Sequence, residues 1–338
     1  MNNLIKPKRL SKGDTIATIS ISGGRSGDSD LIWRYKLGKK RLEEIFELKV
    51  IETPNSMRGS DYLYKNPKAR ADDLMWALKN PEVKGIIANM GGDDSVRLLP
   101  YLDFDIIHSN PKIFMGYSDI TTLTIYFAYA GVMSYYGANL LTPIAQPGNL
   151  DNYTKDAIWK TLFSTDVIGN ILPCNRYTPI EWLDKKEDDI IWKENTGYEL
   201  IQGNGVVQGR LCGGCGGPLC QIMGTHIYPN QEFWKDSIIF LESYSPYGSV
   251  LAGLHELRAL NASGLFHNAK GLITPQLSSE EKSMLLTFLK YEVEREDIPV
   301  LTNVDFGHRT PMTILPVGAM AEINCSKATL SILESGVE

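Results

Sequence analysis

Ser118 stands where a strand is expected to turn into a helix, a position that suits a catalytic nucleophile. Residues 112–115 form a short apolar run, Gly116 follows, and the residues beyond Ser118 are apolar with helical spacing. In a nucleophile elbow, such a turn exposes the hydroxyl and directs the next backbone N–H, here that of Asp119, toward a developing oxyanion. Ile120 replaces the second glycine of the G-x-S-x-G pattern. The same residues also suit an ordinary helix N-cap serine, so both interpretations stay open.

A serine nucleophile needs a base, and the base needs a group that orients it. Among the five histidines, only His308 lies in a loop punctuated by glycine and proline just after an apolar strand. Glu242 ends the apolar run 237–241, so its carboxylate is expected at the carboxyl end of a strand. The chain order Ser118, Glu242, His308 is compatible with a triad, although each residue taken alone also suits a surface loop.

The run Gly91-Gly92-Asp93-Asp94-Ser95 lies between a predicted strand and a predicted helix. A glycine loop in that place can bind a phosphate, but this one lacks both the G-x-G-x-x-G pattern and the lysine of a P-loop. Its two carboxylates would also repel an anion. We therefore predict that backbone N–H groups of this loop, those of Gly92 and Asp93, supply further oxyanion donors.

Cys212, Cys215, Cys220 and His226 follow one another at spacings that could bind a zinc ion. Against a zinc site, Cys220 falls in a predicted apolar helix, and the glycines around these cysteines favour close packing. We therefore expect no metal here.

Trp182 and Trp192 flank a charged run in an otherwise polar segment. Tryptophans are more often core residues. On a polar loop, however, an aromatic ring can close over a ligand by stacking, so both are candidate substrate-binding residues.

The elements that must position these residues alternate between strands and helices over the first 140 or so residues. Strands are predicted at residues 15–20, 48–51, 85–90 and 112–115, and helices at 30–46, at 67–79 and from Ser118 to about residue 130. Strands joined by crossover helices form a mainly parallel sheet with helices on both faces, and ligands bind at the carboxyl ends of its strands. Ser118 and the glycine loop both fall there.

The pattern weakens from about residue 146 to residue 208, which we interpret as a linker and a long surface loop. A second α/β region follows. Its strands are predicted at residues 237–241, 300–301 and 313–323 and its helices at 250–260 and 279–294. We therefore predict an N-terminal domain (1–145) that carries the nucleophile, a linker and active-site loop (146–204), and a C-terminal domain (205–338) that carries the acid and the base.

Composition excludes several classes of partner. The 338 residues include 34 Lys and Arg against 40 Asp and Glu, a net charge of −6, and no long basic run, which argues against nucleic-acid and membrane partners. No window holds the roughly 18 apolar residues of a membrane span. Five cysteines, an odd number, and no visible secretory signal predict a cytoplasmic protein with reduced thiols.

Four motifs occur in a fixed order along the chain. They are Gly91-Gly92-Asp93-Asp94-Ser95 followed by residues 98–103, Asn110-Pro111-Lys112 leading to Gly116-Tyr117-Ser118-Asp119, Phe240-Leu241-Glu242, and Gly307-His308 followed by Pro311 and Leu315-Pro316-Val317-Gly318. Taken in this order, they resemble the serine LD-carboxypeptidase family, and most closely its microcin C7 self-immunity branch. The resemblance runs from about residue 13 to the C-terminus.

The resemblance implies a hydrolase in which Ser118 is the nucleophile, His308 the general base and then acid, and Glu242 the group that orients the imidazole. Backbone N–H groups of Asp119 and of the Gly92 loop would form the oxyanion hole. The implied fold is α/β, with an N-terminal doubly wound, mainly parallel sheet and a C-terminal α/β domain containing a β-barrel-like sheet. The active site would lie between the domains of a homodimer, without a metal or cofactor.

In the immunity branch a loop tryptophan stacks on the nucleobase of a peptidyl-nucleotide, a place that Trp192 fits best and Trp182 second. The chain departs from that branch at two places. Residues 213–217, which include Cys215 and Gly217, replace a Gly-Gly-Asn-Leu-Asn run, and Pro246 replaces a lysine. Both places help to hold the nucleotide in the branch.

The substrate therefore stays open at this point. A small peptide or peptidyl-nucleotide conjugate is favoured, and a murein tetrapeptide is the alternative. The tetrapeptide would need a cation for its carboxylate, with Arg25, Arg97 and Arg309 as candidates. Two other interpretations are an α/β-hydrolase, which shares the chain order of the triad, and a non-catalytic nucleotide- or sugar-binding module.

Overall fold

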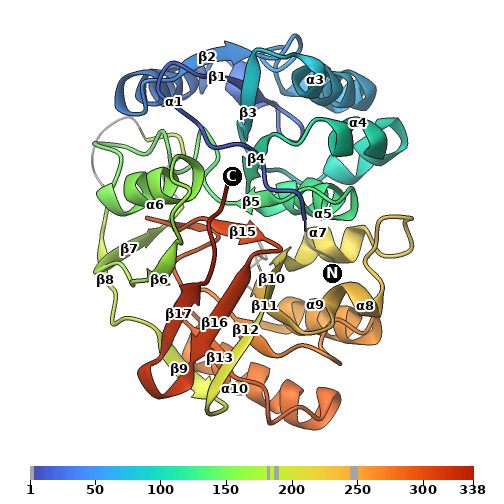
Figure 1. Ribbon diagram of the computed structural model, residues 1–338, viewed down its shortest axis with the longest axis vertical. Coiled ribbons are helices and arrows are strands. Elements are labelled where there is room, and N and C mark those ends of the chain that lie inside the picture. The colour runs from blue at the N-terminus through green and yellow to red at the C-terminus, as the bar shows by residue number, and fades with distance from the viewer. Residues whose placement is uncertain (1–3, 181–182, 186–189, 244–249) are drawn as a thin grey trace.

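The computed structural model describes residues 4–180, 183–185, 190–243 and 250–338, and its two α/β parts lie one above the other in Figure 1. The N-terminal part is built on a six-stranded sheet with the order β15-β5-β4-β3-β1-β2. All its strands pair in parallel except β15, which is antiparallel to β5. The strands are β1 (Thr15–Ile19), β2 (Lys49–Glu52), β3 (Val83–Ala88), β4 (Ile113–Gly116), β5 (Ser134–Tyr136) and β15 (Leu315–Val317).

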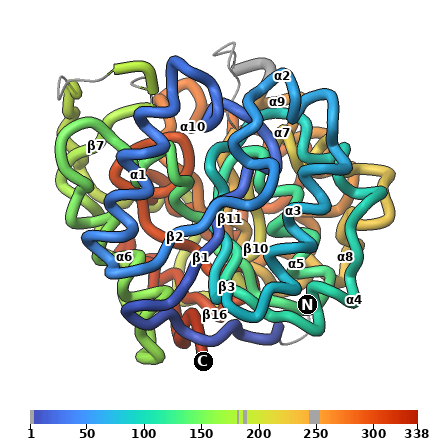
Figure 2. Tube along the Cα trace, turned by 90° about the horizontal axis from the view of Figure 1, so that it is seen from above, coloured from blue at the N-terminus to red at the C-terminus, as the bar shows by residue number. Residues whose placement is uncertain are grey.

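Helices cover both faces of this sheet, as parallel strands joined by crossovers require. Figures 1 and 2 both show α1 on one side and α3 and α5 on the other. α3 begins at Pro67, as predicted, and packs Leu74 and Leu78 into the core. The helices are α1 (Ile32–Ile45), α2 (Ser60–Lys65), α3 (Pro67–Lys79), α4 (Phe104–Ser109) and α5 (Thr121–Tyr129).

The C-terminal part is built on an eight-stranded mixed sheet with the order β6-β17-β16-β10-β11-β12-β13-β9. Its central strands β10 to β13 are parallel, and the strands outside them are antiparallel. The strands are β6 (Gly169–Ile171), β9 (Glu199–Gln202), β10 (Val206–Cys215), β11 (Ser237–Glu242), β12 (Gly271–Ile273), β13 (Val300–Thr302), β16 (Met320–Asn324) and β17 (Thr329–Ile332).

A small third sheet has the order β14-β7-β8, formed by β7 (Arg176–Pro179), β8 (Lys193–Glu194) and β14 (Arg309–Thr310). The remaining helices are α6 (Asn152–Leu162), α7 (Gly216–Gln221), α8 (Gln231–Trp234), α9 (Val250–Ala262) and α10 (Ser279–Phe288), the last continued by a π-helical turn at Leu289–Val293. None of the helices in the described ranges is long and apolar enough to cross a membrane.

The segment interpreted as linker and surface loop differs from that prediction. It holds α6 and the strands β6 to β9, and β6, β9 and β7 pair with β17, β13 and β14 from the C-terminal end of the chain. α6 lies beside α1 in Figures 1 and 2, and the Trp159 ring of α6 contacts Phe46 with centroids 5.7 Å apart. The described residues of this segment are therefore structured and pair with strands of the C-terminal part.

The edge strand β15 of the N-terminal sheet joins the two parts. β15 comes from the C-terminal region yet pairs with β5, so the chain between β13 and β15 crosses from one sheet to the other. His308 lies on this crossing. The predicted α/β fold, with a parallel N-terminal sheet and a separate C-terminal sheet, is confirmed, while the domain boundaries 1–145, 146–204 and 205–338 stay a prediction.

Candidate active site

Ser118 lies just beyond β4, in a turn with an unusual backbone. Its φ angle is 66°, in the left-handed region that residues other than glycine rarely adopt. Two glycines leave room for this turn, because a Cβ at Gly91 would lie 2.8 Å from the Ser118 Cβ and one at Gly116 would lie 2.9 Å from the Ala88 Cβ. The residues around Ser118 thus form the sharp strand-to-helix turn that a nucleophile elbow requires.

The helix-cap alternative for Ser118 is wrong. The N-cap of the 3₁₀ turn Ser118–Ile120 is Tyr117, and that of α5 is Ile120. The Ser118 hydroxyl instead lies 2.9 Å from Nε2 of His308. That contact directs the hydroxyl toward the base that the sequence predicted for it.

Glu242, at the end of β11, holds the other side of the His308 ring. Its Oε2 accepts hydrogen bonds from the backbone N–H of His308 at 2.8 Å and from ring Nδ1 at 3.0 Å. Since an ionised carboxylate only accepts, Nδ1 carries the proton and Nε2 can accept the Ser118 hydroxyl proton. The three predicted residues therefore come together in the order of a triad.

The surroundings of Glu242 favour its charged form. Burial raises the pKa of this carboxyl, but the neighbouring His308 and hydrogen bonds from His308 and Tyr136 hold the pKa below its usual value. Only 3% of the Glu242 side chain is exposed, so few water molecules compete with these contacts. The carboxylate is thus a fixed negative charge behind the His308 ring.

Tyr136 is a residue of the site that sequence reasoning missed. Its phenol oxygen accepts a hydrogen bond from the Ser118 backbone N–H at 3.1 Å and donates one to Glu242 Oε1. It ends β5, whose register places Tyr136 opposite Gly116 of β4. No sequence pattern predicts this contact, because it depends on which strand lies beside β4.

The glycine loop and Asp119, the predicted oxyanion donors, are held together behind Ser118. Asp119 Oδ2 accepts hydrogen bonds from the Ser22 hydroxyl at 2.5 Å and the Ser95 backbone N–H at 2.8 Å. A Cβ at Gly92 would lie 2.3 Å from the Ser22 hydroxyl oxygen. The Asp119 side chain therefore ties the loop to the Ser118 turn, while the oxyanion role of the Gly92, Asp93 and Asp119 N–H groups stays a prediction.

Two arginines balance the charge of Asp94 in this loop, which the sequence did not indicate. Asp94 pairs with the buried Arg70 at 2.7 Å and with Arg97 at 2.8 Å. Arg70 also donates to the Ser22 carbonyl at 3.1 Å. The carboxylate of Asp94 therefore stabilises the loop, and its charge is largely balanced.

Two sequence profiles match the chain, described as the LD-carboxypeptidase N-terminal domain over residues 16–137 and the LD-carboxypeptidase C-terminal domain over residues 208–323. The chain belongs to the LD-carboxypeptidase family. The predicted family and its serine peptidase class are thereby confirmed. The α/β-hydrolase and non-catalytic binding-module alternatives are wrong.

Relatives in this family carry two kinds of name. The microcin C7 self-immunity protein MccF of Escherichia coli is 30% identical over 282 residues, which cover 79% of this chain and 78% of that protein. The probable murein peptide carboxypeptidase of Bacillus subtilis is 27% identical over 342 residues, which cover 98% and 95%. The chain is thus similar to both kinds over most of its length.

Solved structures agree with the family assignment. A MccF-like protein of Bacillus anthracis has a TM-score of 0.85 at 30% identity, over 97% of this chain and 99% of that one. MccF solved in complex with aspartyl sulfamoyl adenosine has a TM-score of 0.86 at 25% identity, over 99% and 100%. The LD-carboxypeptidase fold therefore extends over nearly the whole chain.

The predicted stacking residue Trp192 lies in a groove that the triad does not line. Its ring lies under the Arg176 guanidinium, with 4.1 Å from Cζ to the ring centroid, and Arg176 pairs with Asp151 at 3.1 Å. Pro311, three positions after His308, lines the same groove. Trp182 and Pro246 lie outside the described residues of this LD-carboxypeptidase.

The three candidate arginines for a substrate carboxylate have different surroundings. Arg25 pairs with Asp30 at 2.6 Å, and Arg97 pairs with Asp94. Arg309 lines a small pocket together with Glu242 and His308, but its guanidinium is paired with the buried Asp305 at 2.8 Å. Arg309 therefore shares a pocket with Glu242 and His308, but its charge is already balanced by Asp305.

The cysteine motif does not form a metal centre in the described ranges, where no group of at least three His, Cys, Asp or Glu side chains could hold a metal ion. Cys212 and Cys215 are buried on β10. The glycines between them allow close packing instead: a Cβ at Gly213 would lie 1.8 Å from the Phe240 carbonyl oxygen, and one at Gly214 would lie 2.3 Å from the Thr121 Cγ2.

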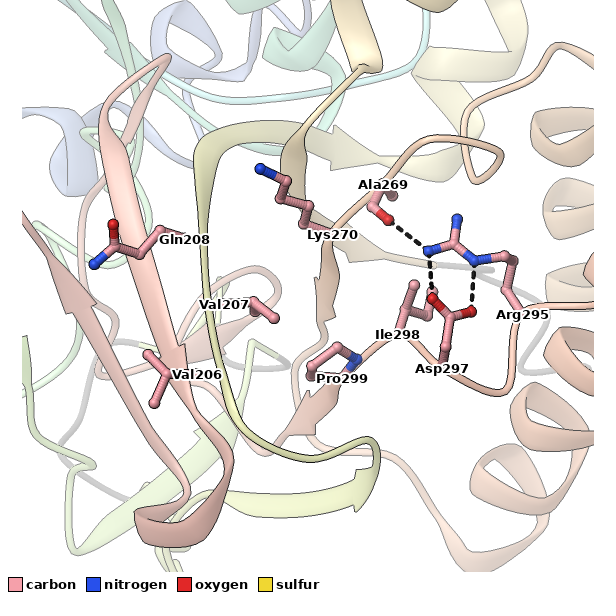
Figure 3. A pocket seen from close by; sticks show the side chains of 9 residues that line it. All are labelled: Val206, Val207, Gln208, Ala269, Lys270, Arg295, Asp297, Ile298 and Pro299. Carbon is pink, nitrogen blue, oxygen red and sulfur yellow. Dashed lines mark hydrogen bonds and ion pairs between the residues drawn. The ribbon is translucent and has the colours of Figure 1, made fainter.

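A further pocket lies in the C-terminal part, between the start of β10 and the loops before β12 and β13 (Figure 3). Arg295, its largest charged side chain, donates to Asp297 and to the Ala269 carbonyl. Lys270 pairs with Asp236 at 3.2 Å, and Gln208 donates to Glu322 at 2.8 Å. These polar side chains of the pocket thus already form hydrogen bonds or ion pairs with other groups of the protein.

Proposed function

We propose that this LD-carboxypeptidase cleaves a C-terminal amide-type bond of a small peptide or peptidyl-nucleotide conjugate through a triad of Ser118, His308 and Glu242. One observation carries the proposal. The Ser118 hydroxyl lies 2.9 Å from His308 Nε2, and His308 Nδ1 lies 3.0 Å from Glu242 Oε2. The same constellation of nucleophile, base and orienting acid performs acyl transfer on unrelated folds.

In this mechanism, Ser118 Oγ attacks the carbonyl carbon of the substrate while His308 Nε2 takes the hydroxyl proton. The C–N bond then breaks, and the imidazolium gives that proton to the leaving amine. Water next attacks the acyl ester with Nε2 again as base, which releases the acid product and frees Ser118. Glu242 keeps the proton on Nδ1 and stabilises the imidazolium throughout.

The developing oxyanion needs donors on the side of the glycine loop. Asp119 N–H follows the nucleophile directly, as in other elbows, and Gly91 approaches Ser118 so closely that only glycine fits. This proximity supports backbone N–H groups of Gly92 and Asp93 as further donors.

Two substrates are compatible with this chemistry. Similarity to MccF, which is solved with aspartyl sulfamoyl adenosine, supports an aminoacyl- or peptidyl-nucleotide. Similarity to the murein peptide carboxypeptidase supports a tetrapeptide that loses its terminal D-residue. We place the nucleotide conjugate first because of the similarity to MccF, although Cys215 and Gly217 depart from the immunity pattern and Trp192 lies in a groove that the proposed triad does not line.

Product analysis by mass spectrometry tests the proposal. The protein and its Ser118→Ala variant are incubated separately with an aminoacyl-adenylate analogue and a murein tetrapeptide. We expect the unaltered protein to cleave the adenylate conjugate and the variant to leave it intact, because only the former has a nucleophile.

Each other outcome has a defined meaning. Release of a terminal D-residue from the tetrapeptide would assign the protein to murein recycling. Cleavage by both proteins alike would contradict Ser118 as nucleophile. If neither substrate were cleaved by the unaltered protein, both proposed substrate classes would be wrong.

The resemblance to the LD-carboxypeptidase family also implies a homodimer, and the odd number of cysteines predicts a cytoplasmic location. Sedimentation equilibrium tests the assembly, with an expected mass of twice the 37.7 kDa chain. A single-chain mass over the whole concentration range would contradict the dimer.

A further inference from the structure

We propose that Tyr136 is a positioning residue that holds Glu242 and the Ser118 turn in one fixed arrangement. The inference rests on the proposed triad and adds a fourth side chain to it. Tyr136 hydrogen-bonds both to the Ser118 backbone N–H, at 3.1 Å, and to Glu242 Oε1. Ser118 belongs to the N-terminal sheet region and Glu242 to the C-terminal sheet, so this phenol links the two sides of the site.

The two hydrogen bonds allow one arrangement of donors. A backbone N–H can only donate, so the phenol oxygen accepts from Ser118, and its own proton goes to the Glu242 carboxylate. Burial, and then the nearby Glu242 charge, raise the pKa of Tyr136 well above its ordinary value, so the phenol keeps that proton. Tyr136 is therefore a neutral donor to the carboxylate.

The carboxylate of Glu242 divides its two oxygens between two partners. Oε2 accepts from His308, and Oε1 accepts from Tyr136. Loss of the phenol would leave Oε1 buried without this donor. A buried acceptor left without its hydrogen bond costs its desolvation free energy, and the cost is larger for a charged group. The carboxylate would then be held from the His308 side alone, with less control over its rotation.

The Tyr136 ring is itself fixed by aromatic neighbours. Phe240 of β11 lies 5.3 Å from it between centroids, and Phe306 of the His308 loop lies 6.3 Å away. The side chain of Tyr136 is fully buried. Phe240 belongs to the strand that carries Glu242, and Phe306 belongs to the loop that carries His308. The position of the Tyr136 phenol is therefore fixed relative to both residues.

Tyr136→Phe removes the phenol oxygen and keeps the ring. We expect kcat to fall about 10- to 100-fold, the range for a hydrogen bond to a charged group. KM should stay within about two-fold, because the Tyr136 side chain is fully buried and does not contact the substrate directly. Steady-state kinetics on whichever conjugate the protein cleaves measures both constants.

Tyr135→Phe is the matched control. Tyr135 is the preceding residue of β5 and is equally buried, and its hydroxyl donates to the Gly336 carbonyl at 2.8 Å. Neighbouring residues of a strand point to opposite faces, so Tyr135 lies away from the triad. Both variants lose one buried hydroxyl, with two hydrogen bonds in Tyr136→Phe and one in Tyr135→Phe, so both should lower the melting temperature. Tyr135→Phe should nevertheless keep kcat within about two-fold.

The pH profile separates positioning from a general loss of structure. The Tyr136 hydrogen bond stabilises ionised Glu242, so its removal raises the pKa of that carboxyl. Protonation of Glu242 ends its hold on Nδ1 and so adds to the loss of activity on the acid side. The acid limb of kcat/KM in Tyr136→Phe should therefore reach to higher pH, whereas Tyr135→Phe should keep the limb of the unaltered protein. A structural defect lowers the amplitude of the profile without moving its limb.

Equal kcat in the two variants, or a loss in Tyr136→Phe with an unmoved acid limb, would overturn the inference. Ser118→Ala keeps this result distinct from a failure of the proposed function. If Ser118→Ala is inactive while Tyr136→Phe behaves like its control, the triad stands and the positioning role falls. If Ser118→Ala retains activity, the triad itself is wrong.

Discussion

Ser118→Ala is expected to lower kcat by about 10⁶-fold, the scale on which a hydrolase responds to loss of its serine nucleophile. The variant lacks the oxygen that must form the acyl ester, and His308 Nε2 loses the hydroxyl at 2.9 Å whose proton it takes. Active-site titration with a fluorophosphonate, together with steady-state kinetics, measures the loss. Thermal unfolding should change little, because the substitution removes one oxygen from a partly open site.

Ser326→Ala is a suitable control for this variant. Ser326 is exposed in the 3₁₀ turn Cys325–Lys327, where its hydroxyl contacts a neighbouring side chain, Asn324, at 2.9 Å. Its kcat should match that of the unaltered protein. Fluorophosphonate labelling of Ser118→Ala equal to that of Ser326→Ala would contradict the assignment of the nucleophile.

His308→Ala extends the same argument to the base. We expect a loss close to that of Ser118→Ala, and the double variant should lose little more, because members of a triad act as one unit. Multiplying losses in the double variant would show that the two residues act independently, despite their contact. The comparison uses one substrate and one pH for all three proteins.

The three residues of the proposed triad could be located from the sequence because each follows its own apolar strand. Ser118 follows β4, Glu242 ends β11, and His308 lies beyond β13, so local pattern alone placed each at a strand end. Parallel pairing brings the ends of β11 and β13 to one edge of the C-terminal sheet, whereas β4 ends in the N-terminal sheet. What the sequence did not predict is the crossing of β15 into the N-terminal sheet, which brings the His308 loop to Ser118.

Tyr136 and the segment before β10 escaped prediction for a related reason. The contact of Tyr136 with Ser118 depends on strand order, and β6 and β9 are short strands that exist by pairing with β17 and β13, far along the chain. The local sequence pattern predicts neither the strand order nor these long-range strand pairs. α6 did carry a local signal, since Asp151 caps it by accepting the Tyr153 backbone N–H at 2.9 Å.

Gly307→Ala is the substitution outside the triad with the largest expected effect. Gly307 has a φ angle of 83°, and a Cβ there would lie 1.9 Å from Glu242 Oε2, far inside van der Waals contact. Either the carboxylate or the loop must move, which breaks the hydrogen bonds from the His308 N–H and Nδ1 to Glu242. We expect kcat to fall about 10³- to 10⁴-fold, as when the orienting carboxylate of a triad is disabled.

Gly13→Ala separates the collision with Glu242 from the cost of the backbone angle. Gly13 has a similar φ of 86°, but no heavy atom lies within 4 Å of the position that a Cβ would take there. Alanine at this position should cost roughly 1 to 2 kcal/mol of unfolding free energy, the penalty of a left-handed residue, and leave kcat unchanged. Gly307→Ala should share that cost and add the loss of turnover, which denaturant unfolding and kinetics measure separately. Equal kcat for the two variants would show that turnover does not need the Glu242 carboxylate in its present position beside Gly307. The proposed role of Glu242 in orienting His308 would then be wrong.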